Sequence, residues 1–355
     1  MKSGKTSKGR LHRNSLKNRS EFMDRMEFTQ GVTRTRVLET KLLDQLTIDK
    51  MVDAKDLEEV LRTLGDTDYA GAVSAVEKGE DYESILSHEL KRSYDLMREI
   101  SPRDEVVDLM ALKYDYHNLK VMLKEHVMNK DLSDLYVQVG TVDFNKLKAM
   151  FKAEQMRDIQ PELKAAIEEI LDDYDQLEDP QRIDILADRH YFKHLYRIAD
   201  KTGIELFKAY VKDYIDFLNV SAAIRLKKQG KDLRFFREVI LFNGNIERDD
   251  ILLTMNDSID VMMNKFRHAR VSKDLLKGLQ AYQETGRLSA FEKYMDNYMI
   301  NLNKDSKSIT FGPEPLFSYL VAKEREIKIL RIIMVSKTNN LSPEAIRERL
   351  RDLYV

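Results

Sequence analysis

The residue types best suited to chemistry are two histidines on one predicted helix. His190 and His194 are four positions apart, so both imidazoles would lie on one helix face, as zinc-binding histidines often do. Asp188 is a further possible ligand nearby. Position 191 is Tyr191, however, and not the Glu that an HExxH zinc site requires. Ordinary histidines of an amphipathic helix are therefore the simpler interpretation, and we expect no metal site.

Other chemistry has less support in the sequence. The acidic residues between positions 168 and 175 lack the Gly and the ligand spacing of a calcium loop, so they predict a solvated helix end. The sequence contains neither a GxxxxGK[ST] phosphate loop nor a GxGxxG or GxSxG motif. It also contains no Cys, which excludes disulfides, thiolate metal sites and cysteine nucleophiles. We therefore expect no catalytic residue, no cofactor and no ATP binding through a phosphate loop.

The composition favours an all-α protein with more than one core. The chain of 355 residues contains only 13 Gly and 6 Pro, and no segment alternates apolar and polar residues convincingly as a half-buried strand does. Apolar residues make up 43 % of the sequence, which is enough for several cores at this length. No run of about 18 apolar residues is present, so we expect no membrane-spanning helix. Because no signal peptide is visible, a cytoplasmic location is the simplest expectation.

The first residues of the chain differ from the rest in charge. Residues 1–22 contain seven Lys or Arg against Glu21 alone, a net charge of +6, whereas the remaining residues sum to −8. Their weak apolar pattern predicts a basic, disordered leader, which we extend to residues 1–32. Such a tail can bind nucleic acid or anionic lipid. The alternative is an upstream start codon or an added leader, with Met23 or Met26 as the natural start.

The last forty-odd residues predict a long helix, a break and a short helix. Pro315 excludes helix before about its own position, and apolar residues then recur at helical spacing as far as Met334. This apolar stripe is wide, so we expect the helix to pack against several neighbours. The rest of the helix is charged, and pairing of Glu324 with Lys328 at i and i+4 is the simplest expectation.

Caps and breaks predict where other helices begin and end. Ser342 can cap the short C-terminal helix, whose first position suits a proline because its missing N–H would be unpaired there. Asp56 can cap a helix over residues 57–64, and Ser289 has capping-box spacing to a following Glu. Two longer helices are expected over residues 82–101 and 106–128.

The chain also repeats itself. Asp115-Tyr-His-Asn118 recurs as Asp216-Phe-Leu-Asn219, and the matches that follow keep the same offset of 101 residues. A third copy is indicated in the C-terminal long helix, at offsets of about 106 to 108. The matches predict three similar helical units, and such units form either a solenoid or a closed ring. We place the units at residues 33–135, 136–233 and 234–355.

The repeat suggests two roles for its polar residues. Asn118 and Asn219 are poor helix formers within apolar helices, so we expect buried amides that hydrogen-bond a neighbouring loop. The sharper hypothesis is that the ends of the three long helices line one rim and present cations to a partner. The candidate partner-binding residues on this hypothesis are Lys124, Arg225 and Arg331.

Two stretches resemble a known family. Arg34-x-Arg-Val-Leu-Glu-x-Lys-Leu-Leu43 and Gly312-Pro-Glu-Pro-Leu-Phe-Ser-Tyr-Leu-Val-Ala-Lys-Glu-Arg-Glu-Ile-Lys328, with Leu341-Ser-x-Glu-x-Ile-Arg-Glu-Arg-Leu350, are similar to the C subunit of bacterial and archaeal V-type (A/V-type) ATPases. This family is the counterpart of the eukaryotic d subunit. The resemblance extends from about Arg34 to the end of the chain and does not include the basic leader.

The resemblance implies a fold and a role. The fold would be a threefold-like funnel of three similar helical domains. The role would be that of a non-catalytic socket, on the cytoplasmic face of the membrane, between the central stalk and the proteolipid rotor ring. The protein would transmit torque between ATP hydrolysis or synthesis and H⁺ or Na⁺ transport, with no nucleic acid partner. The alternative is a free-standing helical scaffold with a basic tail.

Overall fold

The computed structural model describes residues 23–76 and 81–355, and the predicted leader over residues 1–22 lies outside this part of the chain. Within the described residues every regular element is an α- or 3₁₀-helix, so the all-α prediction is confirmed. Residues 25–32 are already helical, and Phe28 is fully buried. The helices are η1 (Arg25–Phe28), α2 (Thr29–Glu39), α3 (Gln45–Asp53), α4 (Leu57–Gly65), α5 (Ala70–Ser74), α6 (Tyr82–Ile100), α7 (Asp104–Met128), η2 (Ser133–Leu135), α8 (Phe144–Lys152), η3 (Met156–Asp158), α9 (Pro161–Leu177), α10 (Pro180–Thr202), α11 (Glu205–Lys228), α12 (Leu233–Val239), α13 (Arg248–Leu252), η4 (Leu253–Asn256), α14 (Ile259–Phe266), α15 (Ser272–Thr285), α16 (Leu288–Lys304), η5 (Asp305–Ser308), α17 (Glu314–Thr338) and α18 (Pro343–Arg349).

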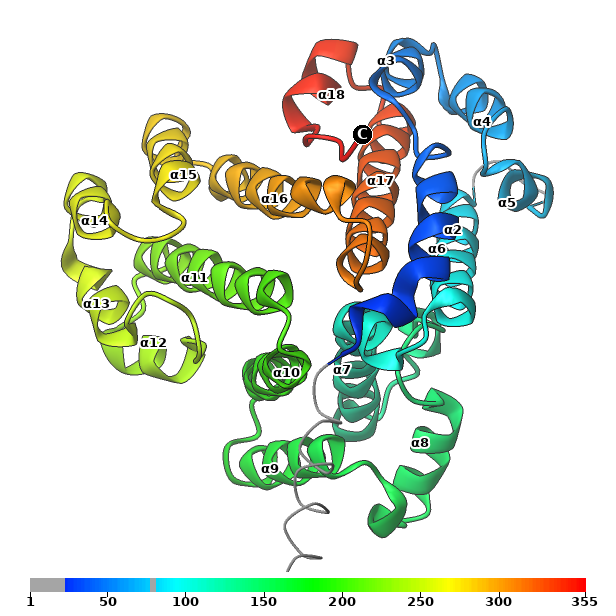
Figure 1. The fold of residues 1–355 in the computed structure, drawn as a ribbon. Helices are drawn as coiled ribbons and strands as arrows, with labels where there is room; N and C mark the ends of the chain where they lie inside the picture. Colours follow the sequence, from blue (N-terminus) through cyan, green and yellow to red (C-terminus); the bar gives the residue numbers. More distant parts are fainter. Residues whose placement is uncertain (1–22, 77–80) are drawn as a thin grey trace, which may run out of the picture.

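The long helices contact one another in a closed cycle. Helix α7 packs on α10, α10 on α11, α11 on α16 and α16 on α17. Helix α17 then packs on α6 and α7, which returns the cycle to its start. Figure 1 shows these helices around the middle of the molecule, with the shorter helices outside them. A closed cycle is compatible with a ring of units, while the threefold funnel itself stays a prediction.

Three hydrophobic cores support the cycle. One core lies within residues 217–295, and the largest joins α7, α9 and α10 to the first turns of α17. The remaining core combines residues 43–86 from the start of the chain with residues 327–353 from its end. The packing therefore connects the two ends of the chain, whereas the predicted limits of the repeats at residues 135 and 233 stay a prediction.

The repeated asparagines have the same role in both copies. The Asn118 side chain donates to the Val137 carbonyl at 2.8 Å and accepts from the Val137 N–H at 2.9 Å. The Asn219 side chain forms the same pair of bonds with Leu241, at 3.0 and 2.8 Å. Each side-chain amide thus pairs with the N–H and C=O groups of a loop residue, which have no hydrogen-bond partner in a helix or sheet. The prediction of buried amides that fix a neighbouring loop is confirmed.

The repeated aspartates fix the same loops. The Asp115 carboxylate accepts the backbone N–H and hydroxyl of Thr141, and Asp216 accepts the backbone N–H groups of Asn245 and Ile246. Burial raises the pKa of both carboxyl groups to about 6, although these hydrogen bonds act in the opposite direction. The two copies therefore share a structural motif of one long helix and the loop that it orders.

Helix α17 is enclosed by α2, α4, α6, α7, α16 and α18, which confirms the prediction of several neighbours. Several of its charged residues are consequently buried, among them Lys323, Arg325 and Glu326. Lys323 is only 1 % exposed and forms ion pairs with Glu89 and Glu326, at 3.1 and 2.7 Å. The predicted pairing of Glu324 with Lys328 is wrong, because each of these side chains reaches a different neighbouring helix.

Candidate functional site

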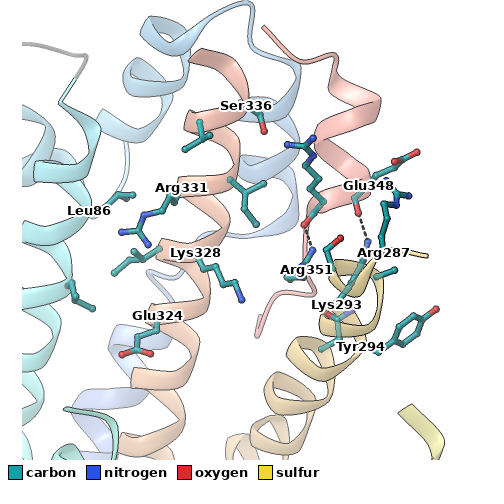
Figure 2. A pocket seen from close by; sticks show the side chains of 18 of the residues that line it. Leu86, Arg287, Lys293, Tyr294, Glu324, Lys328, Arg331, Ser336, Glu348 and Arg351 are labelled. Atoms are coloured by element: carbon teal, nitrogen blue, oxygen red, sulfur yellow. Dashed lines mark hydrogen bonds between the residues drawn. The ribbon is translucent and has the colours of Figure 1, made fainter. Parts of the chain in front are cut away.

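A large cavity lies beside α17. Its volume is about 1450 Å³, and its walls come from both halves of the chain. One face of α17 forms the floor, because Glu324, Lys328, Arg331 and Val335 recur at helical spacing along it. Helices α6 and α7 form one wall, and α16 with α18 forms the other (Figure 2). The lining residues are Leu86, Ser87, Leu90, Lys113, Tyr114, His117, Val137, Ala281, Arg287, Ser289, Ala290, Lys293, Tyr294, Asn297, Glu324, Ile327, Lys328, Arg331, Ile332, Val335, Ser336, Ala345, Glu348, Arg349 and Arg351.

The cavity is strongly basic. Seven of its lining residues are Lys or Arg, against two Glu. Within the part of the chain that the structure describes, Arg287, Lys293 and Arg349 have no ion pair. All three belong to the wall of α16 and α18, where Figure 2 shows Arg287 and Lys293 near Glu348. Burial and the nearby Arg351 lower the pKa of Lys293, as expected where cations are crowded.

Behind this wall, one carboxylate forms ion pairs with three cations. Asp296 of α16 lies 2.6 Å from Lys328, 3.1 Å from Arg351 and 3.5 Å from Arg325. Burial would raise the pKa of Asp296, but Arg325 and Lys328 outweigh it and hold the pKa below its usual range. Glu348 lines the same wall, but the four lining cations Arg287, Lys293, Arg349 and Arg351 outnumber it, so the wall keeps an excess of positive charge.

The opposite wall is locally neutral. Its lining cation, Lys113, forms an ion pair with Glu324, which also accepts hydrogen bonds from Tyr94 at 2.5 Å and Tyr114 at 2.9 Å. The other contributions of α6 and α7 include the apolar side chains of Leu86 and Leu90. The two walls therefore differ in charge. Among the described residues, no group of three or more His, Cys, Asp or Glu side chains is placed to hold a metal ion.

Comparison with known proteins identifies the family of this chain. Residues 31–349 match the family described as ATP synthase (C/AC39) subunit. The chain belongs to this family. It is 26 % identical to the C subunit of the V-type sodium ATPase of Enterococcus hirae over 330 residues, which cover 93 % of this chain and 99 % of that protein. It is 25 % identical to the C subunit of the A-type ATP synthase of Methanocaldococcus jannaschii, over 90 % of this chain and 85 % of that protein.

A third relative has the same description. The C subunit of the A-type ATP synthase of Desulfurococcus sp. is 27 % identical over 89 % of this chain and 88 % of that protein. The resemblance to the C subunit of V/A-type ATPases is thus confirmed over nearly the whole chain. As in the sequence-based expectation, none of the described helices has both the length and the apolarity that a membrane crossing requires.

The three cations predicted to bind a partner lie in different surroundings in this family member. Arg331 lines the large cavity, where it pairs with Glu83 of α6 at 2.8 Å. Arg225 lines a smaller cavity of about 380 Å³ between α10, α11 and α12, and its closest carboxylate is Glu292 at 3.6 Å. Lys124 pairs with Asp184 of α10 at 2.7 Å and lines neither cavity.

The unpaired cations of the large cavity were not predicted from the sequence. Arg287 directly precedes α16, Lys293 lies near the start of that helix, and Arg349 is the last residue of α18. About sixty residues separate them along the chain, so no local pattern brings them together. Only the packing of α16 and α18 on α17 does so.

The two histidines do not face a common ligand. His190 contacts Glu169 of α9 at 2.8 Å, and His194 points into the core, where its Nδ1 atom lies 3.3 Å from the Tyr116 hydroxyl. In the acidic run near the end of α9, Glu168, Glu169, Asp172 and Asp175 are exposed, as predicted for a solvated helix end, and Asp173 pairs with Arg182 of α10 at 2.6 Å. His190 and Asp173 therefore belong to the contact between α9 and α10, whereas His194 belongs to the contact between α10 and α7.

Acidification is expected to destabilise the protein through His194. Burial lowers the pKa of this imidazole to about 4, so the folded protein favours the neutral ring. The stabilisation is present above the unfolded pKa of about 6.5 and is lost as the pH falls towards 4, amounting to about 2 kcal/mol at pH 5. The wild type should lose free energy of unfolding between pH 8 and pH 5, and the His194→Gln variant should lose about 2 kcal/mol less of it. The same pH dependence in both proteins would contradict this prediction.

Proposed function

We propose that this chain is a non-catalytic rotor subunit of a V/A-type ATPase, on the cytoplasmic face of the membrane. In this role it is the socket between the central stalk and the proteolipid ring, and it transmits torque between ATP hydrolysis or synthesis and H⁺ or Na⁺ transport. The observation that supports the socket most strongly is the large cavity whose floor is the enclosed helix α17. Membership of the ATP synthase (C/AC39) subunit family supports the assignment to a rotary complex.

The packing suits a part that transmits torque. A compliant connector would lose rotation as twist, so the part needs stiffness. The closed cycle of long helices, with both chain ends in one core, resists such twisting. Charged side chains on the inside of a socket suit binding in water, with apolar anchors in the middle of the contact.

The experiment that tests the proposal is capture of partners from detergent-solubilised membranes of the native cells. The tagged full chain is the bait, and proteins that stay bound at modest salt are identified by mass spectrometry. Recovery of the stalk proteins together with the proteolipid ring supports the socket. Recovery of neither, with the chain alone in solution, overturns it and favours the free-standing helical scaffold with a basic tail.

We also retain Lys124, Arg225 and Arg331 as proposed partner-binding residues. Their ion pairs are partly exposed to water, so replacement by Ala should cost about 1 kcal/mol of stability or less each. The combined variant Arg225→Ala/Arg331→Ala is expected to capture about tenfold less stalk than the wild type, since loss of a charge at an interface costs about 1 kcal/mol or more. The Lys124→Ala variant is measured separately, because Lys124 lines neither cavity. Unchanged capture with an unchanged melting temperature would remove these residues from the interface.

A further inference from the structure

The large cavity has the length and the width of a helical segment. Its floor extends along α17 from Glu324 to Ser336, which corresponds to about 18 Å at 1.5 Å per residue. A helix about 10 Å across fills on the order of 120 Å³ per residue, so a cavity of about 1450 Å³ accommodates on the order of ten helical residues. Small-molecule sites occupy about 300 to 1000 Å³ and enclose their ligand, so this cavity suits a protein segment better.

The charge of the cavity selects the chemistry of that segment. Arg287, Lys293 and Arg349 supply three positive charges without an ion pair in the described residues, and they all lie on the wall of α16 and α18. Behind them, Asp296 is already shared by three cations. A partner with carboxylates on this side would be attracted and oriented, whereas a basic partner would be repelled.

The floor and the opposite wall select an apolar side of the same segment. Val335 is 37 % exposed on the cavity face of α17, with the partly buried Ile332 beside it. Across the floor, Leu90 of α6 is also partly exposed, and the nearby Lys113 is already neutralised by Glu324. Exposed apolar groups gain free energy only when apolar groups cover them. A phosphate backbone has none, so the floor favours a protein over a nucleic acid.

We propose that the cavity binds one amphipathic helical end of a protein partner, with its acidic side against α16 and α18 and its apolar side against α17 and α6. This inference rests on the proposed socket function and adds to it the chemistry and the orientation of the inserted segment. The unpaired cations orient the partner about the axis of the cavity, and the apolar floor supplies the anchor.

The test compares two variants that change the same total charge. Arg287→Glu/Lys293→Glu/Arg349→Glu reverses the basic wall. The matched control reverses the charge of three exposed lysines outside the cavity. These lysines have no ion pair within the described residues. The control variant is Lys50→Glu/Lys201→Glu/Lys277→Glu. Circular dichroism and thermal unfolding verify that both variants fold as the wild type does.

Capture from solubilised membranes is measured for each full-length variant at several salt concentrations. The wild type and the control are expected to retain their partner, while the wall variant captures at least about tenfold less of it at modest salt. Val335→Glu should also abolish capture, because it places a carboxylate on the apolar floor. Equal capture by the wall variant and the wild type would overturn the inference and leave the socket intact. Absence of any partner on the wild type would overturn the socket itself.

The inserted segment is identified by a photo-crosslinking amino acid at Ala290, a small residue of the basic wall. An acidic helical segment of a partner protein in the crosslinked product supports the inference. A basic segment, a second copy of this chain or a nucleic acid in that product would overturn it.

Discussion

Replacing Lys323 by Met is expected to lower the free energy of unfolding by about 3–5 kcal/mol, the cost of breaking a buried ion pair. Lys323, Glu89 and Glu326 are each at most 3 % exposed. Burial opposes the charged form of Lys323, but Glu326, Tyr319 and Glu89 outweigh it and raise its pKa. Loss of the ammonium would leave two carboxylates in the core between α6 and α17, with Arg92 as the remaining cation on Glu89.

Chemical denaturation measures this effect, and two further variants make it specific. Lys328→Met removes a cation from the same helix, but Lys328 is 49 % exposed, so its loss should cost less than about 1 kcal/mol. The triple variant Lys323→Met/Glu89→Gln/Glu326→Gln should recover part of the loss, since it removes the uncompensated charges. A Lys323→Met protein as stable as the wild type would show that the buried network contributes nothing to folding.

Replacing Gly244 by Ala is expected to destabilise the protein by about 2–3 kcal/mol. A Cβ atom at this position would lie 2.3 Å from an oxygen of Asp216, closer than any non-bonded contact allows. The buried carboxylate would have to move and so lose the hydrogen bonds from Asn245 and Ile246, which are 2.9 and 3.0 Å long. Denaturant unfolding gives the free energy.

Another glycine and a double-mutant cycle separate this clash from the general effect of Ala. Gly71 lies in α5, and a methyl group at its Cα would have no described atom within 4 Å, so Gly71→Ala should be neutral or stabilising by up to about 1 kcal/mol. In an Asp216→Ala background, Gly244→Ala should cost less than about 1 kcal/mol, because the clashing oxygen is gone. If the costs of Gly244→Ala and Asp216→Ala were additive in the double variant, the Asp216 carboxylate would not be the group that excludes a methyl group at position 244.

Local signals in the sequence predicted the helices well. The Asp56 side chain caps α4, and Ser342 caps α18 with Pro343 in the first position. The capping-box prediction at Ser289 is wrong, because α16 begins at Leu288 after Arg287. Gly286 ends α15 with a φ of 65°, and α16 begins two residues later with Arg287 at its N-cap and no side-chain cap.

The interior of the molecule was harder to predict from the sequence. The mixed charges of α17 suggest pairing within the helix in the sequence, yet Lys323 and Glu326 are buried because helices from both ends of the chain enclose them. Repetition predicted the role of Asn118 correctly, since a repeated polar residue in an apolar helix needs a fixed partner. The basic wall depends on contacts between distant segments, so its cations had no signal in any one stretch.

The core that joins the two ends of the chain also constrains synthesis on the ribosome. Tyr69 and Leu43 bond to Glu326 across separations of 257 and 283 residues. At about 5–20 residues per second, the apolar faces of α3 to α6 emerge on the order of ten to fifty seconds before α17 can cover them. Loop closure over such distances is slow compared with local helix formation. Nascent chains should therefore depend on chaperones until their last helices are translated, and truncation just before α17 should yield aggregates rather than a smaller folded protein.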